Sequence, residues 1–313
     1  MRFAGASGVL TGTLQVPPEP VAPWAAAVFL HGSGPQDRDG NGPGLALHLF
    51  DTLAADLAGI GVASVRYDKR GVGESPGDLL ACTVQDLAAD GRAAMRFVRR
   101  LHETARLPVF LVGHSEGTTI GLLLGGEPPV PAGLVLLAPA LTPMEDVLRL
   151  QAAGVQAAVA RLAPAERQRL GIPEQFDQRR VTAQMISAIR ALPPEQPTLT
   201  MGTQTVPARW FRSHFDLDLR ALAASVRCPL LAIGGAKDTQ LPPRDAEALA
   251  AVAREGGTAD ATGLVLADLT HVLRRSAGSG AAGEYAELVK APLDAELRGL
   301  VTAWLVSRRP TEG

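Results

Sequence analysis

The stretch "PVFLVGHSEGTTIGLLLGG", Pro108–Gly126, joins two apolar runs through a short glycine-bounded turn. The first run predicts a buried strand over 108–113, and the second predicts a helix that begins after Ser115. Between them, Gly113–Gly117 fits the pattern G-x-S-x-G, in which the serine occupies a strained turn from strand to helix. The helix directs its free backbone N–H groups toward this turn. The stretch therefore predicts Ser115 as a nucleophile held above a sheet.

Apolar runs of strand length alternate with amphipathic runs on both sides of this stretch. The predicted strands cover 25–32, 62–68, 108–113, 133–139, 228–235 and 262–268. The predicted helices cover 45–59, a segment that begins near Thr83, a segment after Ser115, 244–257 and about 284–307. Thr83 and Asp86 have the spacing of a reduced capping box. Near-continuous apolar strands that alternate with helices indicate an α/β fold with a parallel sheet covered on both faces.

The alternation stops over residues 141–218, which offer no convincing strand. This segment is rich in Ala, Leu, Arg and Gln at helical spacing, and it is broken by Pro143, Pro164, Pro173, Pro193, Pro194 and Pro207. It predicts an inserted cap of three or four helical segments. The core domain would then comprise 1–140 and 219–313, and 275–284 is expected to be a mobile loop.

A serine hydroxyl needs a base, and the base needs an acid that orients it. In folds with this strand-to-helix turn, the order along the chain is serine, acid, histidine. Only His214 and His271 lie well beyond Ser115. His271 follows a predicted strand, whereas His214 lies in the insertion and would precede the acid. His271 is therefore the predicted base.

The predicted acid is Asp238, in "GGAKDTQLPP" directly after the strand 228–235. This position is the carboxyl edge of the sheet, where ligands gather in open α/β folds. Asp268 is a rival, but it is only three residues before His271 and is expected to pack on the same loop. Asp245 falls inside the next helix.

The stretch "HGSGPQDRDGNG", His31–Gly42, has two interpretations. Counted from Asp37, its acidic and amide residues occupy positions 1, 3 and 5 of a calcium-binding loop. Such a loop also needs a bidentate glutamate at position 12 and a helix before it. Position 12 is His48, and a strand precedes the loop, so no metal site is expected.

The alternative is an oxyanion hole, which a glycine-rich loop after an early strand can supply. The predicted donors are the backbone N–H groups of Ser33 and Glu116, with Gly32 or Gly34 as replacements for Ser33. The two glycines are also expected to contact substrate beside Ser115. The neighbouring "DRD" is predicted to be a charged brace, in which Asp37, Arg38 and Asp39 pair with Asp68 and Arg70.

Composition narrows the class of protein. The 313 residues are 46% hydrophobic and 20% charged, with a net charge of −2. Scattered basic residues argue against nucleic acid or an anionic membrane as partner. No signal peptide is expected, and no run approaches the ~18 apolar residues of a membrane span. Cys82 and Cys228 form no disulfide framework, which favours the cytoplasm. The oligomeric state, a homodimer included, stays open.

The quoted motifs, with "YDKRGVGESPG" and "LTHVL", resemble the α/β-hydrolase superfamily in their order along the chain. Within it they are similar to bacterial carboxylesterases of the dienelactone-hydrolase and acyl-peptidase-like branch. The match spans about residues 28–274. It implies a mostly parallel sheet of about eight strands, as in the α/β-hydrolase fold. It also implies a triad of Ser115, Asp238 and His271, an inserted helical cap, no cofactor and a small-molecule ester substrate.

The segment "ARWFRSHFDLD", 208–218, resembles the stretch where the cap of such esterases rejoins the core. Its aromatic residues Trp210, Phe211 and Phe215 either line an apolar substrate pocket or staple the cap to the core. Two features depart from the family. Thr270 replaces the glycine that commonly precedes the histidine, and the N-terminal domain that many relatives carry is expected to be missing.

The triad by itself does not select the substrate. A carboxylesterase for short acyl chains is the first expectation. A serine aminopeptidase, an acyl-peptidase or an acyl-CoA thioesterase would use the same three residues. A non-catalytic interaction protein could keep the fold, but it would normally carry a damaged triad.

Overall fold

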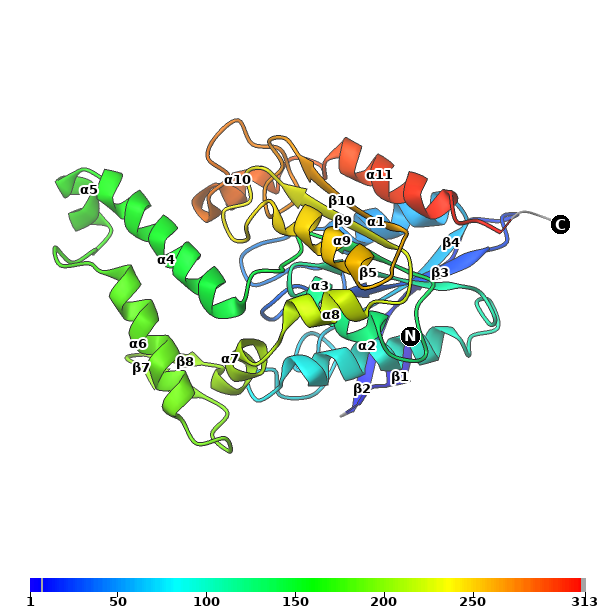
Figure 1. The fold of residues 1–313 in the computed structure, drawn as a ribbon, viewed down its shortest axis with the longest axis horizontal. Coiled ribbons are helices and arrows are strands. Elements are labelled where there is room, and N and C mark those ends of the chain that lie inside the picture. Colours follow the sequence, from blue (N-terminus) through cyan, green and yellow to red (C-terminus); the bar gives the residue numbers. More distant parts are fainter. Residues whose placement is uncertain (7, 311–313) are drawn as a thin grey trace.

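An eight-stranded sheet forms the centre of this computed structural model, which describes residues 1–6 and 8–310 (Figure 1). Its strands are β1 (Arg2–Ala4), β2 (Val9–Gln15), β3 (Ala25–Leu30), β4 (Val62–Tyr67), β5 (Val109–His114), β6 (Gly133–Leu137), β9 (Leu230–Gly235) and β10 (Ala261–Leu266). They lie in the order β1-β2-β4-β3-β5-β6-β9-β10. The pairs β1–β2 and β2–β4 are antiparallel, and the other neighbours are parallel. The predicted mostly parallel sheet is confirmed, and β1 and β2 extend it beyond the strands predicted.

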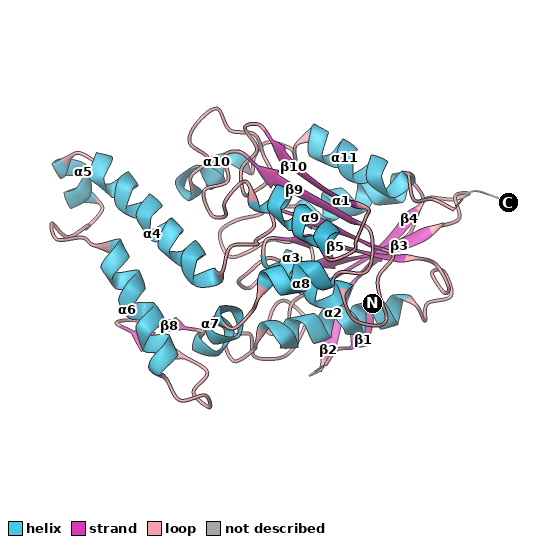
Figure 2. Ribbon diagram, in the orientation of Figure 1, coloured by secondary structure: helices cyan, strands magenta, loops and turns pink. Residues whose placement is uncertain are grey.

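Helices cover both faces of the sheet (Figure 2). The helices of the core are α1 (Leu49–Gly59), α2 (Val84–Val98), α3 (Glu116–Gly125), α8 (Leu219–Ser225), α9 (Asp245–Glu255), α10 (Tyr285–Leu288) and α11 (Ala295–Val306). Buried residues of α1 and α11 pack on one face, around Phe29 and Phe50. Buried residues of α2, α3, α8 and α9 pack on the other, around Leu30 and Leu122. Among the described residues, no helix combines the length and apolar character needed to cross a membrane.

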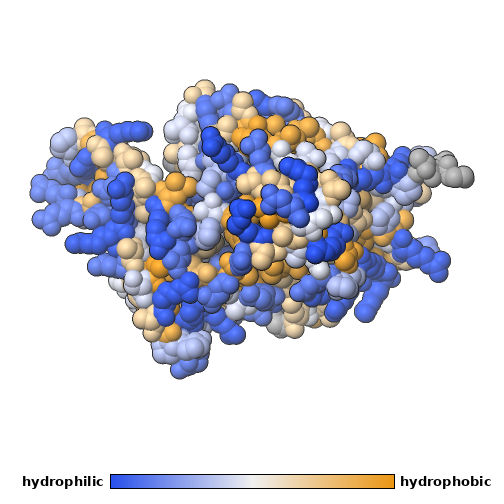
Figure 3. All heavy atoms as spheres, viewed as in Figure 1, coloured by the Kyte–Doolittle hydropathy of each residue, from blue (hydrophilic) through white to orange (hydrophobic). Residues whose placement is uncertain are grey.

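The chain leaves the sheet between β6 and β9 and forms an arm at one end of the molecule (Figure 1). This arm contains α4 (Met144–Arg161), α5 (Pro164–Arg169), α6 (Gln178–Ala191), β7 (Leu199–Met201), β8 (Gln204–Val206) and α7 (Ala208–Phe215). Helix α4 packs against α6, and α7 contacts both of them and α2. Apolar side chains are visible on its surface among polar ones (Figure 3). The large exposed ones are Leu150, Val155, Leu170 and Val181.

The arm contains a hairpin that the sequence analysis did not predict, so the expectation of no strand in 141–218 was wrong. Strands β7 and β8 pair antiparallel, with Met201 opposite Gln204. Gly202 begins the two-residue turn with a φ of 60°, a conformation that tight hairpins require and glycine supplies freely. Strands of three residues carry too few side chains to show an alternating pattern.

The predicted C-terminal helix over 284–307 is interrupted. A short 3₁₀ turn, η1 (Ala282–Glu284), and α10 come first, and α11 begins only at Ala295. Pro292 disfavours a helical residue before it, and the Asp294 side chain caps α11 by accepting from the Leu297 N–H at 2.8 Å. The predicted capping box of α2 is confirmed, because the Asp86 N–H donates to Thr83 Oγ1 at 3.1 Å and the Thr83 N–H donates to the Asp86 carboxylate at 2.8 Å.

Candidate active site

Ser115 stands in the turn between β5 and α3, in a conformation that few residues adopt. Its φ is 53° and its ψ is −117°, which lies outside the regions favoured by residues with a side chain. The two glycines of the motif are sterically required. A Cβ on Gly113 would overlap the Gly117 carbonyl oxygen, and a Cβ on Gly117 would overlap the Leu30 carbonyl oxygen of β3. The turn therefore needs glycine at both positions, because any side chain there would keep these backbone segments apart.

Gly117→Ala is expected to destabilise the protein, because the added methyl group meets backbone rather than a movable side chain. Overpacking of this kind costs at least about 1–3 kcal/mol. Thermal unfolding measured by circular dichroism checks the prediction. Gly154→Ala in α4 is the matched control, since a Cβ there meets open space. Equal melting temperatures for Gly117→Ala and the wild-type protein would contradict the steric argument.

The structure brings Ser115, His271 and Asp238 together in one hydrogen-bonded line. The distance from Ser115 Oγ to His271 Nε2 is 3.1 Å, and that from His271 Nδ1 to Asp238 Oδ2 is 2.8 Å. The His271 and Asp238 side chains are 6% and 3% exposed. Asp238 follows β9 and His271 follows β10, so both stand at the carboxyl edge of the sheet beside the turn that carries Ser115.

Two further hydrogen bonds orient the Asp238 carboxylate, from the N–H groups of Gln240 at 2.8 Å and Leu241 at 2.9 Å. Burial alone would raise the pKa of Asp238. The neighbouring His271 and these hydrogen bonds outweigh burial and hold the pKa below its usual value. Asp238 is therefore ionised near neutral pH and can stabilise a positive charge on the imidazole.

The rival residues are engaged elsewhere. Asp268 is 56% exposed and forms an ion pair with Lys237 at 2.9 Å. Asp245 begins α9 and accepts hydrogen bonds from the N–H groups of Leu141 and Thr142. His214 lies in α7, and its Nδ1 is 3.0 Å from the carbonyl oxygen of Trp210. None of these contacts involves His271.

His114, the residue before Ser115, contacts the backbone of His271. Its Nε2 lies 2.9 Å from the backbone carbonyl oxygen of His271, and the centres of the two rings are 5.2 Å apart. Burial, together with the neighbouring His271, lowers the pKa of His114 to about 3, so its ring is neutral. A neutral ring that donates to this oxygen holds the His271 backbone. Only its position next to Ser115 could have indicated this.

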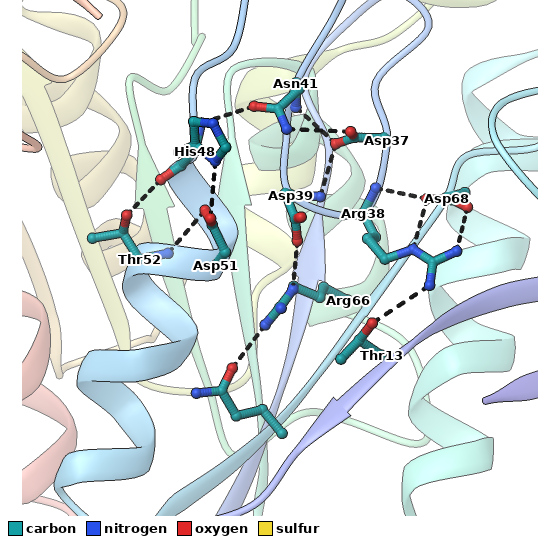
Figure 4. Close-up of polar contacts among 11 residues, drawn as sticks. Thr13, Asp37, Arg38, Asp39, Asn41, His48, Asp51, Thr52, Arg66 and Asp68 are labelled. Carbon is teal, nitrogen blue, oxygen red and sulfur yellow. Dashed lines mark hydrogen bonds and ion pairs between the residues drawn. The ribbon is translucent and has the colours of Figure 1, made fainter. Parts of the chain in front are cut away.

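The loop 31–42 is braced by ion pairs and turn hydrogen bonds (Figure 4). Arg38 forms a bidentate pair with Asp68, at 3.0 Å from Nε and 2.6 Å from Nη2. The sequence pattern predicted Arg70 as a partner in this brace. Asp39 instead pairs with Arg66 at 2.6 Å.

Arg70 itself lies beyond the end of β4 and pairs with Asp90 of α2 at 2.7 Å. Asp37 accepts from the backbone N–H groups of Asp39 and Asn41 at 2.9 Å, which closes the loop on itself. Within the described part of the chain, no group of three or more His, Cys, Asp or Glu side chains is arranged to hold a metal ion.

A cavity of about 210 Å³ opens beside Ser115, and its wall is mainly apolar. Its lining residues are Ser33, Ser115, Glu116, Thr119, Ala140, Met144, Val147, Leu148, Gln151, Trp210, Phe211, His214, Gln240, Leu241 and His271. Of the predicted substrate contacts, Trp210 and Phe211 belong to this wall. Phe215, Gly32 and Gly34 are not among the lining residues described. The Phe215 ring instead lies 5.1 Å below the guanidinium of Arg190.

A second cavity, of about 570 Å³, lies between α4, α6 and the β7–β8 hairpin. Leu148 and Gln151 line both cavities, so these two side chains separate the space at Ser115 from the space inside the arm.

A buried ion pair that the sequence analysis did not predict lies under the cavity. Lys69 Nζ is 3.0 Å from Glu116 Oε2, with side-chain exposures of 3% and 2%. The other carboxylate oxygen, Oε1, accepts from the indole N–H of Trp210 and lies 3.4 Å from His214 Nε2. Burial alone would raise the pKa of Glu116, but the charge of Lys69, the neighbouring His214 and the hydrogen bonds from Lys69 and Trp210 together outweigh burial and lower the pKa. Glu116 is thus an anion that joins the Ser115 turn to α7.

Comparisons with known proteins agree with this fold. Esterase EstD of Thermotoga maritima is 26% identical over 298 residues, which cover 95% of this chain and 65% of EstD. The chain thus spans less than two thirds of that relative. Est1E of Butyrivibrio proteoclasticus, solved with bound ferulic acid, superimposes with a TM-score of 0.62 at 17% identity and 98% coverage of both chains. The Pyrococcus furiosus esterase Pf2001 has a TM-score of 0.58 at 13% identity, over 99% of this chain and 92% of its own.

The likeness to the two solved structures concerns the fold alone. Placement in the dienelactone-hydrolase and acyl-peptidase-like branch stays a prediction. Residues 42–274 match the profile of a family described as serine aminopeptidase, S33. Because this match covers most of the chain and the sheet has the expected order, the protein belongs to the serine aminopeptidase S33 family of α/β-hydrolases.

Proposed function

We propose that this protein is a carboxylesterase-type serine hydrolase that cleaves small acyl esters. The observation that carries the proposal is the hydrogen-bonded line from Ser115 through His271 to Asp238, at the wall of a mainly apolar cavity. A nucleophile, a base and an orienting acid in contact are what acyl transfer requires. The esterase named EstD supports an ester substrate.

In the proposed mechanism, Ser115 Oγ attacks the ester carbonyl carbon while His271 Nε2 takes its proton. The backbone N–H groups of Ser33 and Glu116 donate to the oxyanion that forms, and His271 then returns the proton to the departing alcohol. As the first residue of α3, Glu116 has no helical partner for its N–H. Water, activated by His271, hydrolyses the acyl-enzyme and frees Ser115.

Residues 141–218 act as a cap in this proposal, and α7 is its attachment to the core. Helix α7 contributes Trp210 and Phe211 to the cavity wall, and α4 contributes Met144 and Leu148. These side chains exclude water from the acyl group, which strengthens the electrostatic contacts at the reacting carbonyl.

The cavity volume favours short acyl chains. At about 210 Å³ it is smaller than the ~300–1,000 Å³ of typical ligand pockets. p-Nitrophenyl acetate and butyrate are therefore expected to have higher kcat/KM values than the decanoate. Leu148→Ala should open a path into the second cavity and move the optimum to longer chains. Each additional methylene that the cavity buries is worth about 0.8 kcal/mol, or roughly fourfold in kcat/KM.

A series of p-nitrophenyl esters of rising chain length measures this dependence. Val155→Ala is the matched control, because Val155 lines the second cavity but not the first. A wild-type optimum at long chains, or an equal shift in the control variant, would show that Leu148 does not set the length.

The family description makes a serine aminopeptidase the second candidate. Such an enzyme needs an anion that is free to bind the amino terminus of a peptide. Glu116 is a carboxylate in the cavity wall, but Lys69 and Trp210 already occupy its oxygens. The ester is therefore the favoured substrate.

Two assays test the proposal on the purified protein. A fluorophosphonate probe should label the wild-type protein at Ser115, and p-nitrophenyl acetate should be hydrolysed faster than aminoacyl p-nitroanilides. Preferred cleavage of the anilides would favour the peptidase. A protein that neither labels nor hydrolyses any of these compounds would point to a non-catalytic role.

A further inference from the structure

We propose that Lys69 is a positioning residue that holds both backbone donors of the oxyanion hole in place. This inference rests on the proposed esterase function and adds to it a residue outside the triad. The ammonium group of Lys69 contacts both segments that supply the backbone donors. Lys69 Nζ donates to the Gly32 carbonyl oxygen at 2.9 Å and to Glu116 Oε2 at 3.0 Å.

The first contact acts on the Ser33 donor. The Gly32 carbonyl and the Ser33 N–H belong to a single planar trans peptide, so they point in opposite directions. A charged donor on the carbonyl fixes the plane of that peptide, and polarisation through the peptide makes the N–H a stronger donor. In the described part of the chain, the Ser33 N–H donates to no backbone carbonyl group. It is thus available to the substrate.

The second contact acts on the Glu116 donor. Glu116 places its own N–H beside Ser115, while its side chain is 2% exposed and held by Lys69 and Trp210. An uncompensated carboxylate at this depth would oppose a negative charge that develops at the substrate carbonyl. Lys69 supplies the compensating positive charge. Its role therefore combines orientation of two peptides with neutralisation of the nearby anion.

The neighbouring ion pair of Arg70 and Asp90 lies away from Ser115 and serves as a comparison for Lys69 and Glu116. Arg70 and Asp90 are 2.7 Å apart with exposures of 6% and 3%, so they are as buried as Lys69 and Glu116. Neither residue lines the cavity at Ser115, and the Arg70 side chain otherwise donates to the carbonyl oxygen of Asp86 in α2. Arg70→Met is thus a matched control for the loss of a buried cation.

The test compares Lys69→Met, Lys69→Met/Glu116→Gln and Arg70→Met with the wild-type protein. Lys69→Met leaves Glu116 unpaired, which destabilises the fold. The double variant removes both charges and keeps the volumes, so it is the decisive one. Fluorophosphonate titration counts the active sites, and kcat with p-nitrophenyl acetate is expressed per titrated site. The inhibition constant of an alkyl boronic acid reports on the oxyanion hole, because its adduct with Ser115 places an oxygen there.

The kcat of the double variant is expected to fall about 10- to 100-fold. This is at most the loss of about 10²–10³-fold that follows removal of one oxyanion donor, because both donors are still present but less well held. Its KM should stay within about twofold, and the boronic acid should bind about 10- to 100-fold more weakly. Arg70→Met should lose stability but keep kcat per site.

A double variant with wild-type kcat and boronic acid affinity would overturn the inference, since Lys69 would then be only the counter-ion of Glu116. An equal kcat loss in Arg70→Met would overturn it too. Both results leave the wild-type esterase activity intact. A wild-type protein without activity or labelling would overturn the proposed function and this inference together.

Discussion

Ser115→Ala is expected to lower kcat for p-nitrophenyl acetate by about 10³–10⁶-fold, because the variant has no hydroxyl to form the acyl-enzyme. The residual rate would come from the oxyanion donors and from substrate binding, neither of which needs the serine side chain. Removal of one oxygen from the turn leaves its backbone contacts with Gly113 and Gly117 unchanged. The backbone strain at position 115 should also be unchanged, because alanine has a Cβ like serine and must adopt the same positive φ of 53°.

The measurement is steady-state hydrolysis beside fluorophosphonate labelling and thermal unfolding. Labelling should be lost, and the melting temperature should stay close to that of the wild-type protein. Thr119→Val is a matched loss of a hydroxyl from the same cavity wall, outside the triad. Hydrolysis at the wild-type rate by Ser115→Ala would refute the role of this serine.

Asp238→Asn is expected to lower kcat by about 10⁴-fold, the size of effect seen when the acid of a serine triad is replaced by its amide. The carboxylate accepts from His271 Nδ1 at 2.8 Å, which leaves Nε2 as the acceptor that faces Ser115 Oγ. An asparagine amide can donate to Nδ1 instead, and the ring then presents Nε2–H to the serine. In that tautomer it cannot take the proton. The loss of negative charge also removes the stabilisation of the imidazolium.

Asp268→Asn separates this role from a general loss of charge near His271. Asp268 is the rival acid on the same loop, yet it is exposed and pairs with Lys237. Its φ is 59°, a conformation in which asparagine is well tolerated, so the fold should be kept. The comparison is kcat for both variants at one pH. A larger loss in Asp268→Asn than in Asp238→Asn would reverse the assignment of the acid.

The sequence alone predicted the six parallel strands of the sheet, the strained turn and the three side chains that meet at it. Each of these depends on local patterns. Apolar runs of strand length identify buried parallel strands, and the spacing of Gly113, Ser115 and Gly117 specifies a turn that only two glycines permit. Strand ends at one edge of a parallel sheet lie close together, so residues after β9 and β10 were expected near that turn.

Only the tertiary structure decided which charges meet across segments that are distant in the chain. Lys69, Arg70 and Arg66 are close in sequence, yet they turn to Glu116, Asp90 and Asp39 respectively. Arg66 belongs to β4, whereas Lys69 and Arg70 lie in the loop after it, so their partners depend on where each side chain is directed and on what packs against it there. The β7–β8 hairpin and the attachment of α7 through Trp210 likewise depend on contacts made after the chain has folded. The periodicity of apolar residues along the sequence predicts whether a side chain is buried. Which residue it contacts there is determined by the packing of segments that are distant in the sequence.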